Sequence, residues 1–170
     1  SPFDTSGWMT FDTTNFAMSW ERQLNSDTSW TNGALNTYRG AAGFLDLGWG
    51  ILDPANNFWT LGDSLYTVVA TDGSYKKLWI ESLATGVWNF KYADLNGENE
   101  TSVSFAKTDY PDRNFIYYSM VSDELIDREP ANDSWELTFQ KHQDELMPGL
   151  IMPVTSVFTN KNIWTAKSNE

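Results

Sequence analysis

The sequence predicts an all-β protein, an antiparallel meander that forms a sandwich or a partly open barrel with little helix. No long stretch repeats its apolar residues at the helical period of about 3.6 residues. Short segments of alternating apolar and polar residues follow one another instead, with turn signals about every 8–12 residues. Aromatic residues, which favour strands, make up 15% of the 170 residues.

The N-terminal third is expected to be the less regular part of one domain that spans residues 1–170. Residues 1–63 are rich in Trp, Asn, Thr, Ser and Gly, whereas residues 64–167 carry the regular meander, and no break in composition separates the two. Weak strands are predicted near Ala17–Leu24, Ala34–Tyr38 and Phe44–Gly50. A helical turn at Asn15–Leu24 is the alternative for the first of them.

Four strands are predicted at the start of the meander. They are Ser64–Ala70, Tyr75–Leu83, Val87–Ala93 and Ser102–Lys107, with turns at Asp72-Gly73, Ala84-Thr85-Gly86 and Asn96-Gly97. In the third strand Trp88, Phe90 and Tyr92 share one face, while Asn89 and Lys91 share the other. This alternation is typical of a half-buried antiparallel strand.

The second half of the meander is predicted in the same way. After a polar loop at Asp109–Asn114, strands are expected at Phe115–Met120, Leu125–Asp127, Ser134–Lys141, Val154–Phe158 and Ile163–Ala166. In Ser134–Lys141 we expect the apolar face, Trp135, Leu137 and Phe139, to point inward. We expect Glu136, Thr138 and Gln140 to point outward.

Charge and composition exclude several classes of protein. With 11 Lys and Arg against 23 Asp and Glu, the formal charge is −12, so nucleic acids and anionic bilayer surfaces would be repelled. Disulfides and thiolate chemistry are excluded because the chain has no Cys. No apolar run is long enough for a transmembrane segment. Because the chain opens on Ser1-Pro2-Phe3, we expect it to be a mature or excised fragment that has lost its targeting segment, if it had one.

The sequence offers no specific sign of catalysis, so we expect the protein not to be an enzyme. His142 is the only His, nothing near it marks a nucleophile, and it is expected in a solvated loop. Asp127-Arg128-Glu129-Pro130 is interpreted as a salt-bridged turn rather than an acid–base centre. No phosphate-binding loop or serine elbow is present.

An acidic turn after the third strand raises the possibility of a structural calcium ion. Asp94, Asn96, Asn99 and Glu100 group oxygen ligands around Gly97. Their spacing differs from that of an EF-hand, and a hairpin with a polar tip is the favoured interpretation.

Five Trp residues are spread through the irregular part and are candidates for stacking on sugar rings. They are Trp8, Trp20, Trp30, Trp49 and Trp59. Most indoles in a folded protein serve in the core, so we expect one or two of the five at the surface.

Several segments together resemble a known family. They are Leu61–Val68, Thr71–Leu83, Trp88–Gly97, Phe115–Ser119, Trp135–Phe139 and Pro153–Asn160. This series of motifs, which covers residues 60–163, resembles the HmuY-like β proteins of Bacteroidota. The motif order departs from the family, because the Trp135–Phe139 strand follows the Asp72-Gly73-Ser74-Tyr75 hairpin whereas haem-binding members have it before.

The resemblance implies an all-β fold, export to the bacterial cell surface and, for some members, haem capture through paired His or Met side chains. The ligand pair of the haem binders has no counterpart at a matching place here. The candidates in this chain are His142, Met147, Met152, Met120, Met9 and Met18. A buried Met is more often a filler of the core.

The expected function is that of a non-catalytic, secreted or cell-surface module that binds a ligand, with haem as one candidate. The alternative is a carbohydrate-binding or adhesive module that uses its exposed Trp side chains. The expected partners are a small molecule or a glycan, and other surface proteins of the same envelope.

Overall fold

The computed structural model describes Trp8, residues 21–26 and residues 29–168, and in these parts the protein is all-β. Among the described residues, the 3₁₀ turn η2 (Ala34–Asn36) precedes the first strand, whereas η3 (Pro54–Asn56) and η4 (Lys107–Asp109) connect strands. No described helix reaches seven residues. Within the same residues, no helix has the length and apolar character needed to cross a bilayer.

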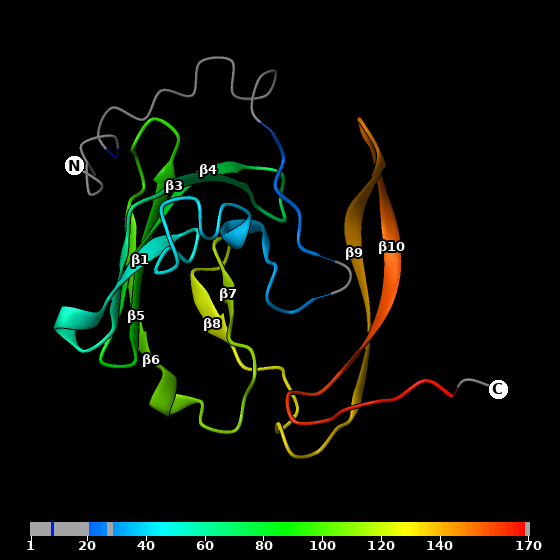
Figure 1. The fold of residues 1–170 in the computed structure, drawn as a ribbon. Coiled ribbons are helices and arrows are strands. Elements are labelled where there is room, and N and C mark those ends of the chain that lie inside the picture. The colour runs from blue at the N-terminus through cyan, green and yellow to red at the C-terminus, as the bar shows by residue number, and fades with distance from the viewer. Residues whose placement is uncertain (1–7, 9–20, 27–28, 169–170) are drawn as a thin grey trace.

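Six strands form the main sheet (Figure 1). They are β1 (Gly50–Asp53), β2 (Trp59–Gly62), β3 (Leu65–Val69), β4 (Tyr75–Ala84), β5 (Val87–Asp94) and β6 (Thr101–Ala106). Their order is β1-β2-β4-β5-β6, β3 also pairs with β4, and every pairing is antiparallel. The described strands do not close into a barrel.

Both β2 and β3 pair with the same strand, β4, and Gly62 makes this possible. β2 pairs near Leu83 and β3 pairs with the other end of β4. A Cβ atom on Gly62 would lie only 1.7 Å from the carbonyl oxygen of Ile80. The register of β4 on β5 shifts just beyond Ile80. β2 and β3 therefore run in the same direction along β4, and the interruption between them begins where the backbones approach too closely for any side chain.

The core lies on one face of the main sheet. Leu78, Phe90 and Tyr92 are its buried residues. Leu78 and Ile80 lie opposite Tyr92 and Phe90, so their alternation places them all on the same face. The side chains packed against this cluster are Leu35, Tyr66, Val68, Ile80, Val103, Phe105, Tyr118 and Met120.

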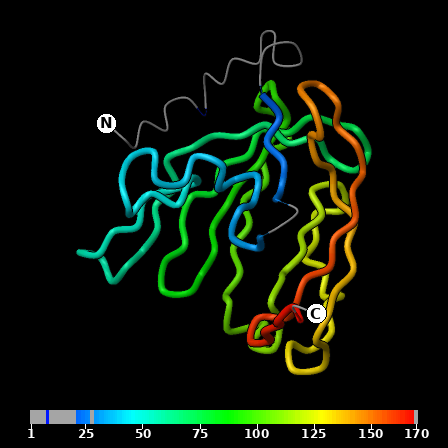
Figure 2. Tube along the Cα trace, turned by 45° about the vertical axis from the view of Figure 1, so that its right-hand side comes forward, coloured from blue at the N-terminus to red at the C-terminus, as the bar shows by residue number. Residues whose placement is uncertain are grey.

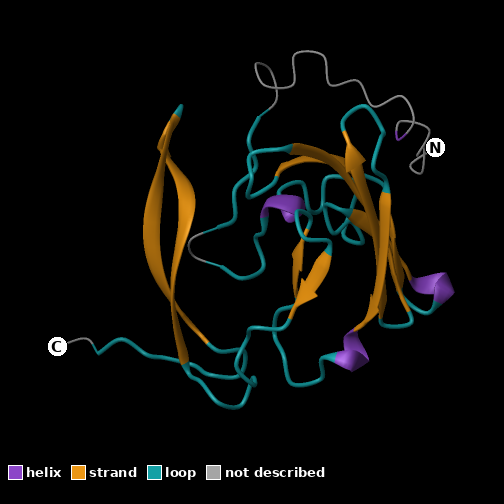
Figure 3. Cartoon of the chain, turned by 180° about the vertical axis from the view of Figure 1, so that it is seen from behind, coloured by secondary structure: helices purple, strands orange, loops and turns teal. Residues whose placement is uncertain are grey.

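Two hairpins complete the fold. β7 (Tyr117–Ser119) pairs with β8 (Glu124–Ile126), and Tyr118 contacts the core from this hairpin. β9 (Leu137–Met147) pairs along its length with β10 (Leu150–Thr159) and forms a separate two-stranded sheet. Figures 1 and 3 show this β9–β10 hairpin standing away from the main sheet.

The structure confirms the predicted strands between residues 64 and 107 and corrects several others. Ala34–Tyr38 contains the 3₁₀ turn η2 instead of a strand, and Phe44–Gly50 contributes one isolated bridge, at Asp46, before β1 begins. The irregular N-terminal third was expected to hold only weak strands, yet β1 and β2 extend the main sheet there. Ile163–Ala166 forms no strand. Residues 21–24 have no regular structure, and residues 15–20 lie outside the described residues.

The predicted orientation of the Ser134–Lys141 strand is wrong. β9 begins at Leu137 and continues to Met147, and the side chains of Leu137 and Phe139 are 50% and 78% exposed. Thr138 and Gln140, expected outside, are half-buried. The alternation correctly groups the side chains that share a face, but the apolar face points to solvent.

Candidate functional site

A pocket of about 850 Å³ lies beside the β9–β10 hairpin. Its walls come from residues 25–26 and 29–33, from the chain around β7 and β8, and from residues 135–142. Figures 1 and 2 show residues 25–26 and 29–33, in blue, between the main sheet and the β9–β10 hairpin. The volume lies in the range of small-molecule sites, which is about 300–1,000 Å³.

Aromatic, polar and charged side chains all line this pocket. The aromatic ones are Trp30, Phe115, Tyr117 and Trp135. The hydroxyl and amide ones are Asn25, Ser26, Ser29, Asn32, Thr138 and Gln140. The ionisable ones, besides Tyr117, are Arg128, Glu129, Lys141 and His142. Aromatic surface supplies contact area, and convergent polar groups orient a ligand.

Trp30 forms a partly exposed aromatic wall. Its ring centroid lies 4.7 Å from that of Phe115 and 4.5 Å from that of Phe158. The indole N–H donates to the carbonyl of Thr159 at 3.4 Å, and 44% of the residue is exposed. Packing on one side thus fixes the ring while leaving other surface accessible.

Glu129 is a buried carboxylate with one oxygen unused. The residue is 8% exposed, and its Oε2 accepts a hydrogen bond from the backbone N–H of Phe115 at 2.5 Å. Among the described residues, no hydrogen-bond partner reaches Oε1, which is itself buried. Burial and, second, the negative charge of Glu129 raise the pKa of Tyr117. A buried polar atom without a partner costs about 1–3 kcal/mol, and a ligand whose donor reaches this oxygen would offset that cost.

The turn around Glu129 differs from the expected salt-bridged turn. Asp127 pairs with Arg113, whose Nε lies 2.8 Å from the carboxylate, and not with the neighbouring Arg128. This contact is the first cause of the raised pKa of Arg113. The turn is therefore tied to the preceding loop, which leaves Arg128 and Glu129 on the pocket.

Trp135 and His142 add further unsatisfied groups. The indole Nε1 of Trp135 and both ring nitrogens of His142 are buried, and no described residue forms a hydrogen bond with them. His142 was expected in a solvated loop, but it lies within β9 opposite Val154. It is half-buried and lines the pocket. The prediction failed because β9 continues to Met147, well past the last clear alternation of apolar residues.

Asn160 connects the elements that hold Trp135. The residue is 6% exposed, and its Nδ2 donates to the carbonyls of Asn132 and Trp135, both at 2.6 Å. Its Oδ1 accepts from Nδ2 of Asn114 at 2.9 Å. One side chain thus joins the loop before β7, the loop before β9 and the end of β10.

Of the haem-ligand candidates that lie among the described residues, only His142 lines the pocket. Met120 packs against the core of the main sheet, and Met147 and Met152 lie on the β9–β10 hairpin, 61% and 43% exposed. Met9 and Met18 lie outside the described residues. Of these candidates, the described residues therefore offer a porphyrin one imidazole and no Met side chain, in a pocket with many amide and hydroxyl groups.

The Trp candidates divide between core and pocket. Trp8 and Trp49 are buried, and Trp59 is half-buried. Trp30 is the one that lines the pocket, while Trp20 lies outside the described residues. The ring of Trp8 instead lies under the ammonium groups of Lys77 and Lys91, and its indole N–H donates to Glu100 at 2.7 Å.

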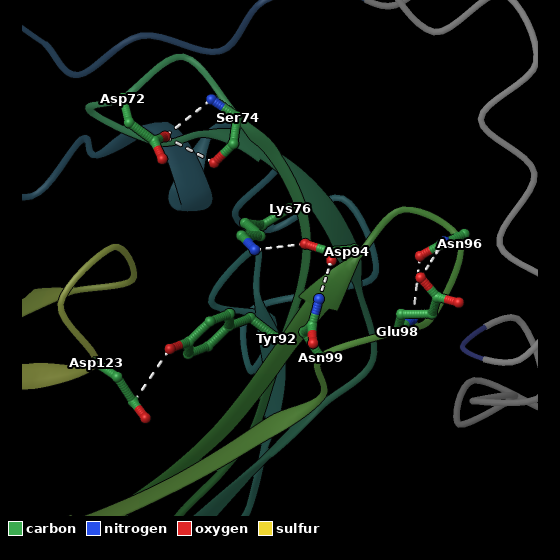
Figure 4. A network of polar contacts seen from close by, with 9 residues as sticks. All are labelled: Asp72, Ser74, Lys76, Tyr92, Asp94, Asn96, Glu98, Asn99 and Asp123. Carbon is green, nitrogen blue, oxygen red and sulfur yellow. Dashed lines mark hydrogen bonds and ion pairs between the residues drawn. The ribbon is translucent and has the colours of Figure 1, made fainter.

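The calcium candidates are engaged in other contacts (Figure 4). Asp94 pairs with Lys76 and accepts from Nδ2 of Asn99 at 2.6 Å, and these contacts lower its pKa, the bond from Lys76 first. Nδ2 of Asn96 donates to Glu98. Glu100 points to Trp8. In the described part of the chain, no group of three or more His, Cys, Asp or Glu side chains is placed to hold a metal ion.

Comparisons with protein-family models, with curated proteins and with solved structures found no match for this chain.

Sequence reasoning missed Glu129, Trp135 and Asn160 as site residues. The sequence carries no local signal for Glu129, because it stands beside Pro130 after a predicted strand, where carboxylates are usually exposed. Its burial and the position of Asn160 depend on contacts between distant segments, which a single sequence does not show.

Proposed function

We propose that this protein is a non-catalytic, secreted or cell-surface module that binds a carbohydrate in the pocket beside β9. The observation that carries the proposal is the pairing of an accessible indole, Trp30, with unpartnered polar atoms on Glu129, Trp135 and His142 in one pocket. Sugars present both an apolar ring face and hydroxyl groups, so they match such a surface.

The carboxylate count supports binding rather than hydrolysis. Glycosidases generally use two carboxyl groups, one on each side of the bond that is cleaved. Among the described residues that line the pocket, Glu129 is the only carboxylate. A single carboxylate can orient a sugar by hydrogen bonding without providing the acid–base pair.

Binding can be tested by isothermal titration calorimetry and affinity gel electrophoresis against a panel of soluble glycans. We expect at least one glycan to bind, and Trp30→Ala to weaken that binding about tenfold because the stacking surface is lost. Trp164→Ala is the matched control, since Trp164 is 84% exposed and does not line the pocket. Equal losses in the two variants, or no binding across the panel, would reject the proposal.

Haem is a second candidate, and the observation that favours it is His142 with two unpartnered ring nitrogens on the pocket. If haem binds here, its titration should give a sharp Soret band that His142→Ala removes and Met152→Ala leaves unchanged. A featureless titration with the wild-type protein would reject haem.

A further inference from the structure

The most informative group in the pocket is the unused oxygen of Glu129. More than nine-tenths of this residue is buried, it lines the pocket, and no described residue forms a hydrogen bond with Oε1. The single hydrogen bond from Phe115 satisfies only the other oxygen. A buried carboxylate is stable when a cation or several donors complete its contacts.

The described part of the chain does not supply that cation. Its ion pairs join Lys76, Lys91 and Arg113 to other carboxylates, and none includes Glu129. Arg128 also lines the pocket, but it forms no ion pair with its neighbour Glu129. The missing positive charge can therefore come from a ligand.

The surroundings of Glu129 suit an ammonium group. The backbone N–H of Phe115 donates to its carboxylate, and Phe115 and Tyr117 line the same pocket. The ring of Trp30 packs against Phe115. Aromatic faces attract cations, most strongly where water is excluded.

Other groups in the same pocket suit hydroxyl and ether oxygens. The indole N–H of Trp135 is a donor without a partner, and a sugar oxygen could accept from it. Thr138 and Gln140 line the adjacent wall. The ligand that matches all of these groups carries an amine together with several oxygen atoms.

We propose that the pocket recognises sugars that carry a free, protonated amine, with Glu129 as the residue that pairs with the ammonium group. This inference rests on the proposed carbohydrate binding and narrows it to amino sugars. The formal charge of −12 acts in the same direction, because an acidic protein attracts cationic ligands at long range.

The test compares two probes that differ only at the amine. Oligomers of glucosamine and oligomers of N-acetylglucosamine of the same length are titrated into the wild-type protein by calorimetry, at a mildly acidic pH where the free amine is protonated. We expect the glucosamine oligomer to bind about tenfold tighter or more, because it forms a charge-assisted bond. This advantage should shrink as salt is added.

Glu129→Gln identifies the residue. The amide keeps the size of the side chain and an acceptor for the N–H of Phe115, but it removes the charge. We expect this variant to lose the preference for the free amine while it still binds the acetylated oligomer. Glu136→Gln, the same change at an exposed residue that does not line the pocket, should keep the preference.

The outcomes separate this inference from the proposed function. Equal affinity for both oligomers in the wild-type protein would overturn the amine inference and leave carbohydrate binding standing. A preference that Glu129→Gln retains would also overturn it. Binding of neither oligomer, together with other glycans that bind, would overturn the inference alone, whereas failure of the whole panel would remove both. Because the first comparison uses the wild-type protein, poor folding of the variant would not leave the question open.

Discussion

The main sheet and the β9–β10 hairpin share the same alternation of apolar and polar residues. The main sheet buries its apolar face, whereas the hairpin turns its apolar face to solvent. In the main sheet Phe90 and Tyr92 point into a core, and Tyr118 of β7 and Leu35 of η2 pack against it. In the hairpin Phe139 points to solvent, and the polar side of β9 faces the pocket. Alternation therefore identifies which side chains share a face, whereas the packing of distant segments decides which face is buried.

The largest expected difference between the two regions is the effect of removing a ring. Phe90→Ala should lower the free energy of unfolding by about 3–5 kcal/mol, because it opens a cavity in the core. Phe139→Ala should change it by no more than about 0.5 kcal/mol, since that ring is 78% exposed. Urea unfolding followed by Trp fluorescence measures both. Similar losses in the two variants would mean that the hairpin face is covered in solution.

A second contrast concerns glycines in the two regions. Gly62→Ala should cost about 3 kcal/mol, because its Cβ would collide with the carbonyl of Ile80 across β2 and β4. Gly149, in the turn between β9 and β10, has a φ of +81° and open space around it. Gly149→Ala should therefore lower the free energy of unfolding by only about 1 kcal/mol, which is the strain of a positive φ at a residue that has a side chain. Equal midpoints of urea unfolding for the two variants would contradict the close approach at Gly62.

Asn160 tests how the hairpin is attached to the rest of the chain. Asn160→Ala should lower the free energy of unfolding by about 2 kcal/mol, because it leaves the partly buried carbonyls of Asn132 and Trp135 without their donor. Ligand binding should also weaken, since Trp135 would lose its support. Asn99→Ala, in the exposed turn before β6, is the matched control and should have little effect on binding. Unchanged stability and binding in the Asn160 variant would show that other contacts position β9.

The sequence predicted the all-β class and the strands of the main sheet because their signals are local: period-two alternation in β5 and turn residues such as Asp72-Gly73. It did not predict β1 and β2, whose few residues include Gly50 and Gly62 at close backbone contacts. Of the site, Trp30 and His142 were candidates on residue type alone. Glu129 was not, because its burial arises from the way the chain around β7 packs against the turn after β8.

The smallest predicted effect on the free energy of unfolding concerns the hydrogen bonds between segment 35–48 and the main sheet. The hydroxyl of Tyr66 donates to the carbonyls of Leu35 and Gly48, at 3.2 and 3.1 Å. Tyr66→Phe should therefore cost about 1 kcal/mol at neutral pH. Burial raises the pKa of Tyr66 from 10.0 to about 12.

The pH dependence of that loss distinguishes a buried hydroxyl from an exposed one. Since the folded state holds the Tyr66 proton more tightly than the unfolded state, its contribution is complete below pH 10 and is lost as the pH rises toward 12. The deficit of the Phe variant relative to wild type should thus shrink over that interval, because the variant has no proton to lose there. Urea midpoints of both proteins at a series of alkaline pH values measure it, and the other Tyr and Lys side chains cancel in the difference. A deficit that stays constant with pH would show that Tyr66 ionises at its ordinary pKa and that solvent reaches the junction between the main sheet and segment 35–48.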